Sequence, residues 1–136
     1  MQKEFTKQAE RVLETAKVLA KKMKHPYVGT EHVLLALRKE FMGVAGQVLE
    51  ANKIDGDEIT KLIVEMTATI EGGKKGRLEF SPRLEFLLDN ALMEAVRQNS
   101  ERIGTEHMLL AMMKDGDSVA TRILATLNAD LAKIVL

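Results

Sequence analysis

The sequence predicts an all-α domain in which two related helical repeats pack about a pseudo-two-fold axis into one compact bundle of about eight helices. An internal repeat is the first observation behind this prediction, because the segment GTEHVLLA that starts at Gly29 returns as GTEHMLLA at Gly104, 75 residues later. Composition is the second observation. Aromatic residues make up only 4% of the 136 residues, and Ala, Leu and Met are frequent, which favours helices over strands.

The register of the repeat extends well beyond this segment and contains no insertion. Identical residues recur at the same offset in Phe5 and Phe80, Leu13 and Leu88, Ala16 and Ala91, Ala20 and Ala95, Lys39 and Lys114, Ala45 and Ala120, and Leu49 and Leu124. We therefore interpret residues 1–136 as a single domain. Repeat 1 covers about 5–55, a bridging helix and a Gly-rich linker cover about 56–79, and repeat 2 covers about 80–130.

Repeat 1 is expected to contain three helices. Thr6 is a candidate N-cap, and apolar residues follow it at helical spacing until Pro26 ends the helix. Thr30 is expected to cap the second helix, whose residues Val33, Leu34 and Leu37 would face inward. Gly43 then separates this helix from a third one.

A bridging helix and a second set of three helices follow. Asp55 and Glu58 have the spacing of a capping box ahead of apolar residues that recur up to Ile70, and residues 72–76 form a Gly- and Lys-rich connector. In repeat 2, Ser81 is the expected N-cap with Pro82 at the first helical position, and Thr105 is expected to cap the next helix. A last helix is expected after Asn128, with Leu131, Ile134 and Val135 on its apolar face.

Several classes of function conflict with the composition. The 20 basic and 20 acidic residues give a net charge of zero, whereas proteins that bind nucleic acid by neutralising phosphates carry a basic excess. There is no Cys, no apolar signal sequence and no apolar run long enough to span a membrane, so we expect a cytoplasmic protein without disulfides. Gly73 and Lys74 lie outside any P-loop pattern, and no Ser has the context of a nucleophile. We expect no catalytic residue and no cofactor in this chain.

The N-terminal Phe5-Thr6 pair, the Tyr27-Val28-Gly29-Thr30-Glu31-His32 segment and its second copy resemble the Clp N-terminal domain, closest to its ClpC branch. The resemblance covers nearly the whole chain. It implies a domain that docks adaptor proteins and protein substrates, some of them arginine-phosphorylated, for an attached ATPase ring that feeds the ClpP protease. Residues that the resemblance assigns to ligand or adaptor binding are Glu31, Glu106, Thr6, Ser81, Arg83, Phe5 and Phe80.

Two departures from the family pattern bear on binding. Arg83 follows Phe80 by three residues, but the equivalent position of repeat 1 is Gln8, which has no charge to pair with a phosphate. We therefore expect the site of repeat 2, with Glu106, to bind a phosphorylated ligand more strongly. The acidic-Gly turn of repeat 2 is replaced in repeat 1 by a segment in which Phe41 and Met42 are expected to be exposed.

Simpler structural roles compete with these assignments. Glu31 and Glu106 each lie in the first turn of a helix, where a carboxylate complements the helix dipole, and Thr6 and Ser81 are first of all caps. His32 and His107 lack a second ligand at helical spacing, so we interpret them as helix-start residues hydrogen-bonded into the packing and expect no metal. Gly29 and Gly104 are expected to allow a tight loop.

Two other functions stay open. A stand-alone double-repeat protein could act as an accessory or regulatory subunit of a Clp protease complex, and the coding sequence beyond residue 136 would decide between it and an ATPase. A helix-turn-helix regulator would need a basic recognition helix, and the helix after Thr30 offers only Arg38 and Lys39 near its end.

Overall fold

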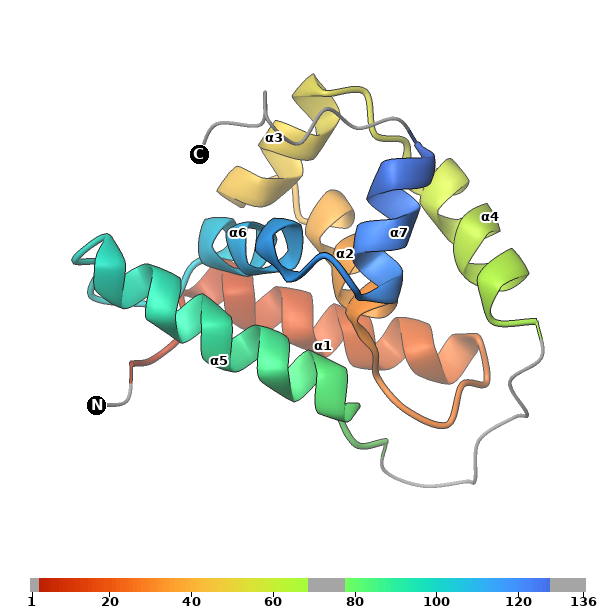
Figure 1. Ribbon diagram of the computed structural model, residues 1–136, viewed down its shortest axis with the longest axis horizontal. Coiled ribbons are helices and arrows are strands. Elements are labelled where there is room, and N and C mark those ends of the chain that lie inside the picture. The colour runs from red at the N-terminus through yellow and green to blue at the C-terminus, as the bar shows by residue number, and fades with distance from the viewer. Residues whose placement is uncertain (1–2, 69–77, 128–136) are drawn as a thin grey trace.

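The computed structural model describes residues 3–68 and 78–127, and these residues form seven α-helices (Figure 1). The all-α prediction is confirmed, and the helix number agrees with the expected value of about eight. The predicted last helix and the 72–76 connector lie outside the described residues. In chain order the helices are α1 (Lys7–Lys22), α2 (Thr30–Lys39), α3 (Val44–Ala51), α4 (Gly56–Met66), α5 (Pro82–Arg97), α6 (Thr105–Asp115) and α7 (Val119–Thr126).

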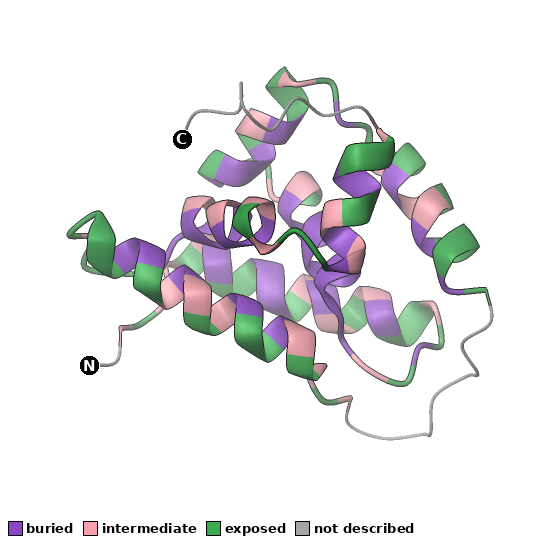
Figure 2. Ribbon diagram, in the orientation of Figure 1, coloured by how far each residue is buried: buried purple, intermediate pink, exposed green. Residues whose placement is uncertain are grey.

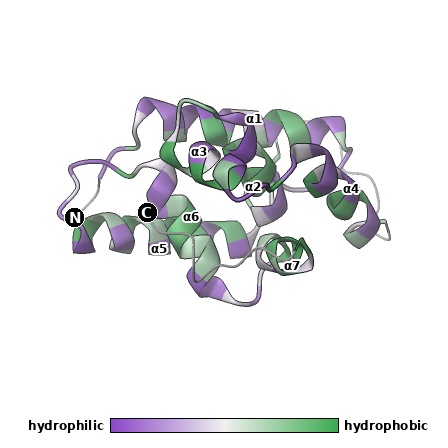
Figure 3. Ribbon diagram, turned by 90° about the horizontal axis from the view of Figure 1, so that it is seen from above, coloured by the Kyte–Doolittle hydropathy of each residue, from purple (hydrophilic) through white to green (hydrophobic). Residues whose placement is uncertain are grey.

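Helix α2 lies at the centre of the bundle and is buried on all sides (Figure 2). Helices α1, α3, α4, α5, α6 and α7 all contact it. The sequence pattern predicted only one inward face, but Leu35 is buried as well because α4 covers part of the helix that a free amphipathic helix would expose. Figure 3 shows hydrophobic residues gathered between the helices and hydrophilic residues on the outer surfaces.

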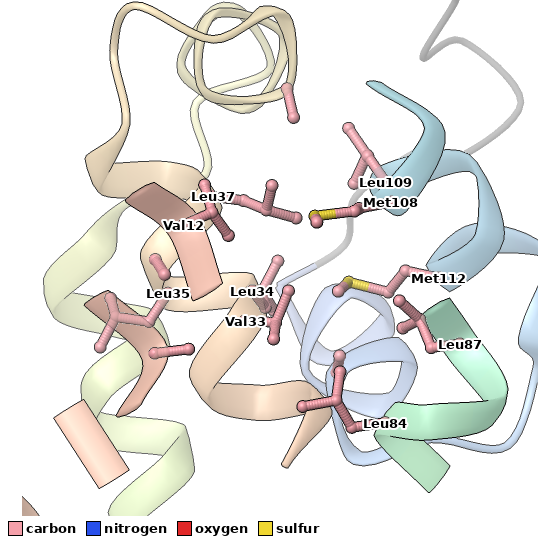
Figure 4. Close-up of a cluster of buried hydrophobic side chains, with 14 of the residues drawn as sticks. Val12, Val33, Leu34, Leu35, Leu37, Leu84, Leu87, Met108, Leu109 and Met112 are labelled. Carbon is pink, nitrogen blue, oxygen red and sulfur yellow. The ribbon is translucent and has the colours of Figure 1, made fainter. Parts of the chain in front are cut away.

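The core continues from α2 into repeat 2. Figure 4 shows Val33 and Leu34 of α2 facing Met112 of α6 and Leu84 of α5. These four side chains are fully buried, and the flexible Met side chain fills the irregular space between the repeats. Burying each such side chain contributes about 1.5–3 kcal/mol to folding, so one shared core holds the two repeats together. No helix in the described part of the chain has the length and apolar character needed to cross a bilayer.

The expected caps at the first helix of each repeat are confirmed. Thr6 Oγ1 accepts a hydrogen bond from the backbone N–H of Ala9, and Ser81 Oγ accepts one from Leu84, each at 3.1 Å. Asp55 likewise caps α4 by accepting from the N–H of Asp57 at 3.0 Å.

The prediction that Thr30 and Thr105 cap their helices is wrong. Gly29 and Gly104 are the N-cap residues of α2 and α6. Their N–H groups donate to Nδ1 of His32 and His107, each at 2.8 Å. Because a histidine in the first turn fixes the backbone of each cap, the threonine hydroxyl is available for a bond to the other repeat.

Two short parallel bridges join the repeats. Phe5 pairs with Ile103, and Val28 pairs with Phe80. The 75-residue offset converts one bridge into the other, so the two contacts are related by the pseudo-two-fold symmetry that the sequence predicted. Each bridge places the start of one repeat's second helix beside the start of the other repeat's first helix.

Candidate functional site

Three helix N-termini from both repeats meet around Glu31. Val28 N–H donates to the carbonyl of Glu79, and Ser81 N–H donates to the carbonyl of Val28, both at 2.9 Å, which holds the start of α2 beside the start of α5. Thr30 Oγ1 accepts from the N–H of Ala120 at 3.3 Å and so joins the start of α7. The Glu31 pocket between them has a volume of about 350 Å³ and is lined by Tyr27, Thr30, Glu31, Ser81, Arg83, Asp117, Ser118, Val119 and Arg122.

The Glu31 carboxylate lies at the buried base of this pocket. Glu31 is only 1% exposed, and its Oε2 atom has no hydrogen-bond partner among the described residues. Burial raises the pKa of Glu31 above its ordinary value, although the backbone at the helix start, Arg122 and Tyr27 each lower it in part. A buried carboxylate oxygen without a partner is costly, and a ligand that supplies a positively charged N–H donor would remove that cost.

Cationic side chains occupy the rim of the Glu31 pocket. Arg83 is partly exposed and contacts Asp117, with 3.1 Å between Nη2 and Oδ2. Arg122 lies on the exposed side of α7 and is close enough to Glu31 to lower the pKa of its carboxylate. The pocket therefore combines a negative charge at its base with positive charges at its entrance.

Gly29 makes room for this carboxylate. Its backbone is extended, with φ at −109°, so the position does not need glycine for a left-handed turn. A Cβ atom at Gly29 would instead collide with the Glu31 carboxylate, and one at Gly104 would collide with that of Glu106. In each Gly-Thr-Glu sequence, the glycine thus leaves space for the glutamate side chain to fold back over the start of its own helix.

The second copy of the motif builds an equivalent arrangement of helix starts at Glu106, which we call the Glu106 site. Thr6 N–H donates to the carbonyl of Ile103 at 2.9 Å, and Thr105 Oγ1 accepts from the N–H of Ala45 at 3.2 Å. The starts of α6, α1 and α3 therefore meet here as those of α2, α5 and α7 meet at Glu31. Glu106 is half-buried, so its carboxylate is more accessible than that of Glu31.

The side chains around the two glutamates differ. At the offset of 75 residues, Gln8 stands in place of Arg83, Gln47 in place of Arg122, Met42 in place of Asp117 and Arg102 in place of Tyr27. Arg102 is engaged at the surface, where it donates to Glu4 at 3.0 Å. The Glu106 site thus has a neutral glutamine at each of the two positions where α5 and α7 carry an arginine beside Glu31. Phe41 and Met42 are exposed, as the sequence predicted.

We expected Arg83 to lie at the site of Glu106, because both residues belong to repeat 2, and this expectation is wrong. Arg83 belongs to repeat 2 in sequence, but it lines the pocket of Glu31 from repeat 1. Each bridge joins the segment before the second helix of one repeat to the segment before the first helix of the other repeat. Each glutamate therefore lies beside the first helix of the other repeat. Sequence analysis also missed Tyr27 and Arg122 as lining residues, because α7 and the loop before α2 come together only in the folded chain.

The remaining predicted site residues lie next to the two bridges. Ser81 lines the Glu31 pocket, and Thr6 occupies the equivalent cap position beside the Glu106 site. Phe5 and Phe80 are partly buried and pack against the hydrophobic core. Phe80 also borders a separate hollow together with Lys17 and Glu85. The structure therefore brings Glu31, Ser81 and Arg83 together and holds the two phenylalanines at the bridges.

Both motif histidines are hydrogen-bonded into the packing, as predicted. In repeat 1, Gly29 N–H donates to His32 Nδ1, so His32 Nε2 carries the hydrogen and faces His25 Nδ1 at 2.7 Å. Burial and the neighbouring His25 lower the pKa of His32 to about 3. In repeat 2, Ser100 replaces His25, and His107 Nε2 lies 3.2 Å from Gln98 Oε1.

Comparison with known proteins identifies the family. The family model described as the Clp repeat (R) N-terminal domain matches residues 4–134. The chain belongs to the Clp N-terminal domain family. The Clp N-domain of ClpC, the ATP-dependent Clp protease ATP-binding subunit of Staphylococcus aureus, is 36% identical over 131 residues. That match covers 95% of this chain but only 16% of the relative.

Solved Clp N-domains have the same fold. The N-terminal domain of ClpD from Arabidopsis thaliana has a TM-score of 0.78 at 21% identity, covering 96% of this chain and 89% of that one. The Hsp104 N-terminal domain from Candida albicans has a TM-score of 0.76 at 16% identity, covering 97% and 87%. A ClpV N-domain solved in complex with a VipB peptide has a TM-score of 0.75 at 20% identity, covering 95% and 81%.

Proposed function

We propose that this Clp N-domain docks polypeptides for a Clp ATPase and that the Glu31 pocket recognises a phosphorylated arginine side chain on them. The observation that carries the proposal is the buried Glu31 carboxylate, whose Oε2 atom has no hydrogen-bond partner in the described part of the chain and whose pocket is lined by two arginines. A ligand that fits must carry a cationic N–H donor at its inner end and an anionic group further out.

Phosphoarginine meets both requirements in one side chain. Its guanidinium can donate to the Glu31 carboxylate through a charge-assisted hydrogen bond. Its phosphoryl group would lie at the rim, where Arg83 and Arg122 supply positive charge and the N-termini of α5 and α7 supply backbone N–H groups. Unmodified arginine satisfies only the inner half of the pocket, and free phosphate satisfies only the outer half.

Sequence similarity to ClpC supports the proposed role in docking polypeptides for a Clp ATPase. The N-terminal region of that ATP-binding subunit is 36% identical to this chain, and a ClpV N-domain of the same fold binds a VipB peptide. Delivery of a bound polypeptide to an ATPase ring, and from there to the ClpP protease, is part of the proposal. Adaptor proteins would use the same domain as their docking point. Reading the coding sequence downstream of residue 136 tests whether ATPase motifs follow.

Calorimetric titration with free phosphoarginine tests the pocket directly. The parent chain should bind it at one high-affinity site, whereas arginine and phosphate added separately should bind at least about tenfold more weakly, since each satisfies one half of the pocket. Glu31→Gln should weaken phosphoarginine binding by about a hundredfold, because a neutral amide replaces the charge that pairs with the guanidinium.

Glu106→Gln is the matched control, because it makes the same chemical change at the equivalent position of the other repeat. It should change the high-affinity site less than about twofold. Equal losses in Glu31→Gln and Glu106→Gln would contradict the assignment to one pocket, and parental affinity in Glu31→Gln would refute phosphoarginine recognition at Glu31.

A further inference from the structure

A second hollow lies between α5 and α6, and it shares Arg83 with the Glu31 pocket. Its volume is about 430 Å³. The polar groups that line it are Asn90, Glu94, Arg97, Lys114 and Asp115. We call it the α5–α6 groove.

Buried carboxylates hold the cations of this groove in place. The Glu94 side chain is only 6% exposed, and its Oε1 atom accepts from Arg97 Nη1 at 2.6 Å and from Lys114 Nζ at 2.8 Å. The hydrogen bond from Lys114 is the main reason why the pKa of Glu94 lies below its ordinary value. The side chain of Asp115 is only 5% exposed, and its Oδ2 atom forms a loose 3.6 Å ion pair with Arg83 Nε but no hydrogen bond in the described residues.

The cations face outward while the acids lie beneath them. The side chains of Arg97 and Lys114 are 60% and 59% exposed, in contrast to the buried Glu94. Each cation carries more N–H donors than its contact with Glu94 uses, since an ammonium has three donors and a guanidinium five. An approaching molecule therefore meets oriented positive donors, and an anion is the group that they complement.

Apolar side chains lie on the same part of α5. Phe86 and Met93 are both exposed, and Phe86 lines the groove. The Arg83 guanidinium lies over the Phe86 ring, 5.6 Å from its centre. Phe86, Asn90, Met93 and Arg97 are spaced so that they share one helix face, which places apolar area beside the cations.

The equivalent region of repeat 1 does not reproduce this arrangement. Leu19 replaces Glu94, so no buried acid holds Lys39, the counterpart of Lys114. Arg11 replaces Phe86 and binds Glu40 through two hydrogen bonds of 2.9 and 3.2 Å. The buried acid, the fixed cations and the exposed ring thus occur together in repeat 2 and not at the matching positions of repeat 1.

We infer that the α5–α6 groove is a second docking surface, which takes an acidic polypeptide segment carrying an exposed aromatic or aliphatic side chain. The acidic side chains of the partner would pair with Lys114, Arg97 and Arg83, and its apolar side chain would pack against Phe86. This contact needs neither a phosphoryl group nor Glu31. Because Arg83 lines both hollows, one extended polypeptide could occupy both.

Fluorescence anisotropy with a labelled synthetic peptide tests the surface. The probe contains glutamates on both sides of a phenylalanine and has no arginine and no phosphoryl group, and a matched probe has glutamine at each glutamate. The parent chain should bind the glutamate probe saturably and the glutamine probe at least about tenfold more weakly, since the charge-assisted hydrogen bonds are lost. The absence of saturable binding to the glutamate probe would overturn the proposal.

Paired variants locate the probe on the molecule. Lys114→Gln should weaken binding about tenfold while Glu94 keeps its contact with Arg97, and Lys39→Gln, the matched change in repeat 1, should alter it less than about twofold. Phe86→Ala, at an exposed position that does not endanger folding, should also weaken binding. Equal losses in Lys114→Gln and Lys39→Gln would show unspecific charge attraction and overturn the proposal.

Glu31→Gln separates this surface from the Glu31 pocket. It should leave binding of the glutamate probe unchanged even though it removes phosphoarginine binding. Loss of the probe in Glu31→Gln would place the peptide in the Glu31 pocket and overturn the proposal.

Discussion

The Glu31 pocket and the Glu106 site share one backbone arrangement but carry different side chains. In each, three helix starts meet, a glutamate folds back over a glycine, and a threonine accepts a hydrogen bond from the other repeat. Arg83 and Arg122 surround Glu31, whereas Gln8 and Gln47 occupy the matching positions near Glu106. The comparison shows that the two copies of a duplicated scaffold can share a backbone geometry while only one of them carries arginines beside its glutamate.

The difference in charge around the two glutamates is hard to see in the sequence, because the bridges place each glutamate beside residues of the other repeat. A substitution in the first helix of one repeat changes the site of the other repeat's glutamate. Gln8 therefore belongs to the Glu106 site and not to the Glu31 pocket, although it lies in the same repeat as Glu31. Residues of both repeats thus form the surroundings of each glutamate.

Exchanging the arginines and glutamines between the Glu31 pocket and the Glu106 site should have the largest effect on phosphoarginine binding. Arg83→Gln with Arg122→Gln gives the Glu31 pocket the residues of its counterpart, and phosphoarginine affinity should fall about a hundredfold because two charged contacts are lost. Gln8→Arg with Gln47→Arg should create a second calorimetric binding site at Glu106. If the stoichiometry stays at one ligand per chain after this transfer, the equivalence of the two scaffolds is wrong.

The buried histidine pair of repeat 1 should make the domain sensitive to acid. The pKa of His32 is about 3 in the folded chain against 6.5 for an ordinary histidine, so the unfolded chain takes up a proton first as pH falls. Stability is therefore present above the ordinary value and is lost below it, by about 2 kcal/mol between pH 7 and pH 5.

Urea unfolding at the two pH values measures this loss. His32→Gln should lower stability at pH 7, because the hydrogen bond to Gly29 is disturbed, yet it should reduce the difference between pH 7 and pH 5. A difference as large as that of the parent would show that other groups carry the acid sensitivity.

Neutralising the two glutamates should have small and unequal effects on stability. Burial raises the pKa of Glu31, so the folded chain favours its protonated form, and its contribution to stability is lost as pH rises through that pKa. At pH 7, Glu31→Gln should stabilise the ligand-free domain by about 1 kcal/mol, since the cost of burying the charge outweighs its contacts with Arg122, Tyr27 and the backbone. Thermal or urea unfolding at neutral pH measures this gain.

Glu106→Gln provides the comparison for that measurement. Glu106 is half-buried, so solvent already screens its charge and the change in unfolding free energy should be smaller. A larger gain in Glu106→Gln than in Glu31→Gln would contradict the view that burial sets the cost of the charge.

Local patterns predicted most of the fold. Thr6 and Ser81 cap α1 and α5 because their hydroxyls reach backbone N–H groups three residues away, a distance that sequence spacing already contains. At Thr30 the local spacing misleads, because Gly29 is the N-cap and donates to His32 in the first turn, while the Thr30 hydroxyl accepts from Ala120, 90 residues further along the chain. Local spacing cannot show whether a threonine hydroxyl caps its own helix or accepts a hydrogen bond from a residue far away in the sequence.

The sequence by itself determined that the chain is helical, that it is duplicated with a constant offset, and that each copy carries one glutamate at a helix start. Only the tertiary structure decided which cations face which glutamate, because the two bridges pair Val28 with Phe80 and Phe5 with Ile103 across the repeats. It also decided that Glu31 is buried, with one oxygen that has no hydrogen-bond partner within residues 3–68 and 78–127, while Glu106 is half-exposed. The physical reason is that helix formation and capping depend on neighbours in the sequence, whereas burial and ion pairing depend on neighbours in space.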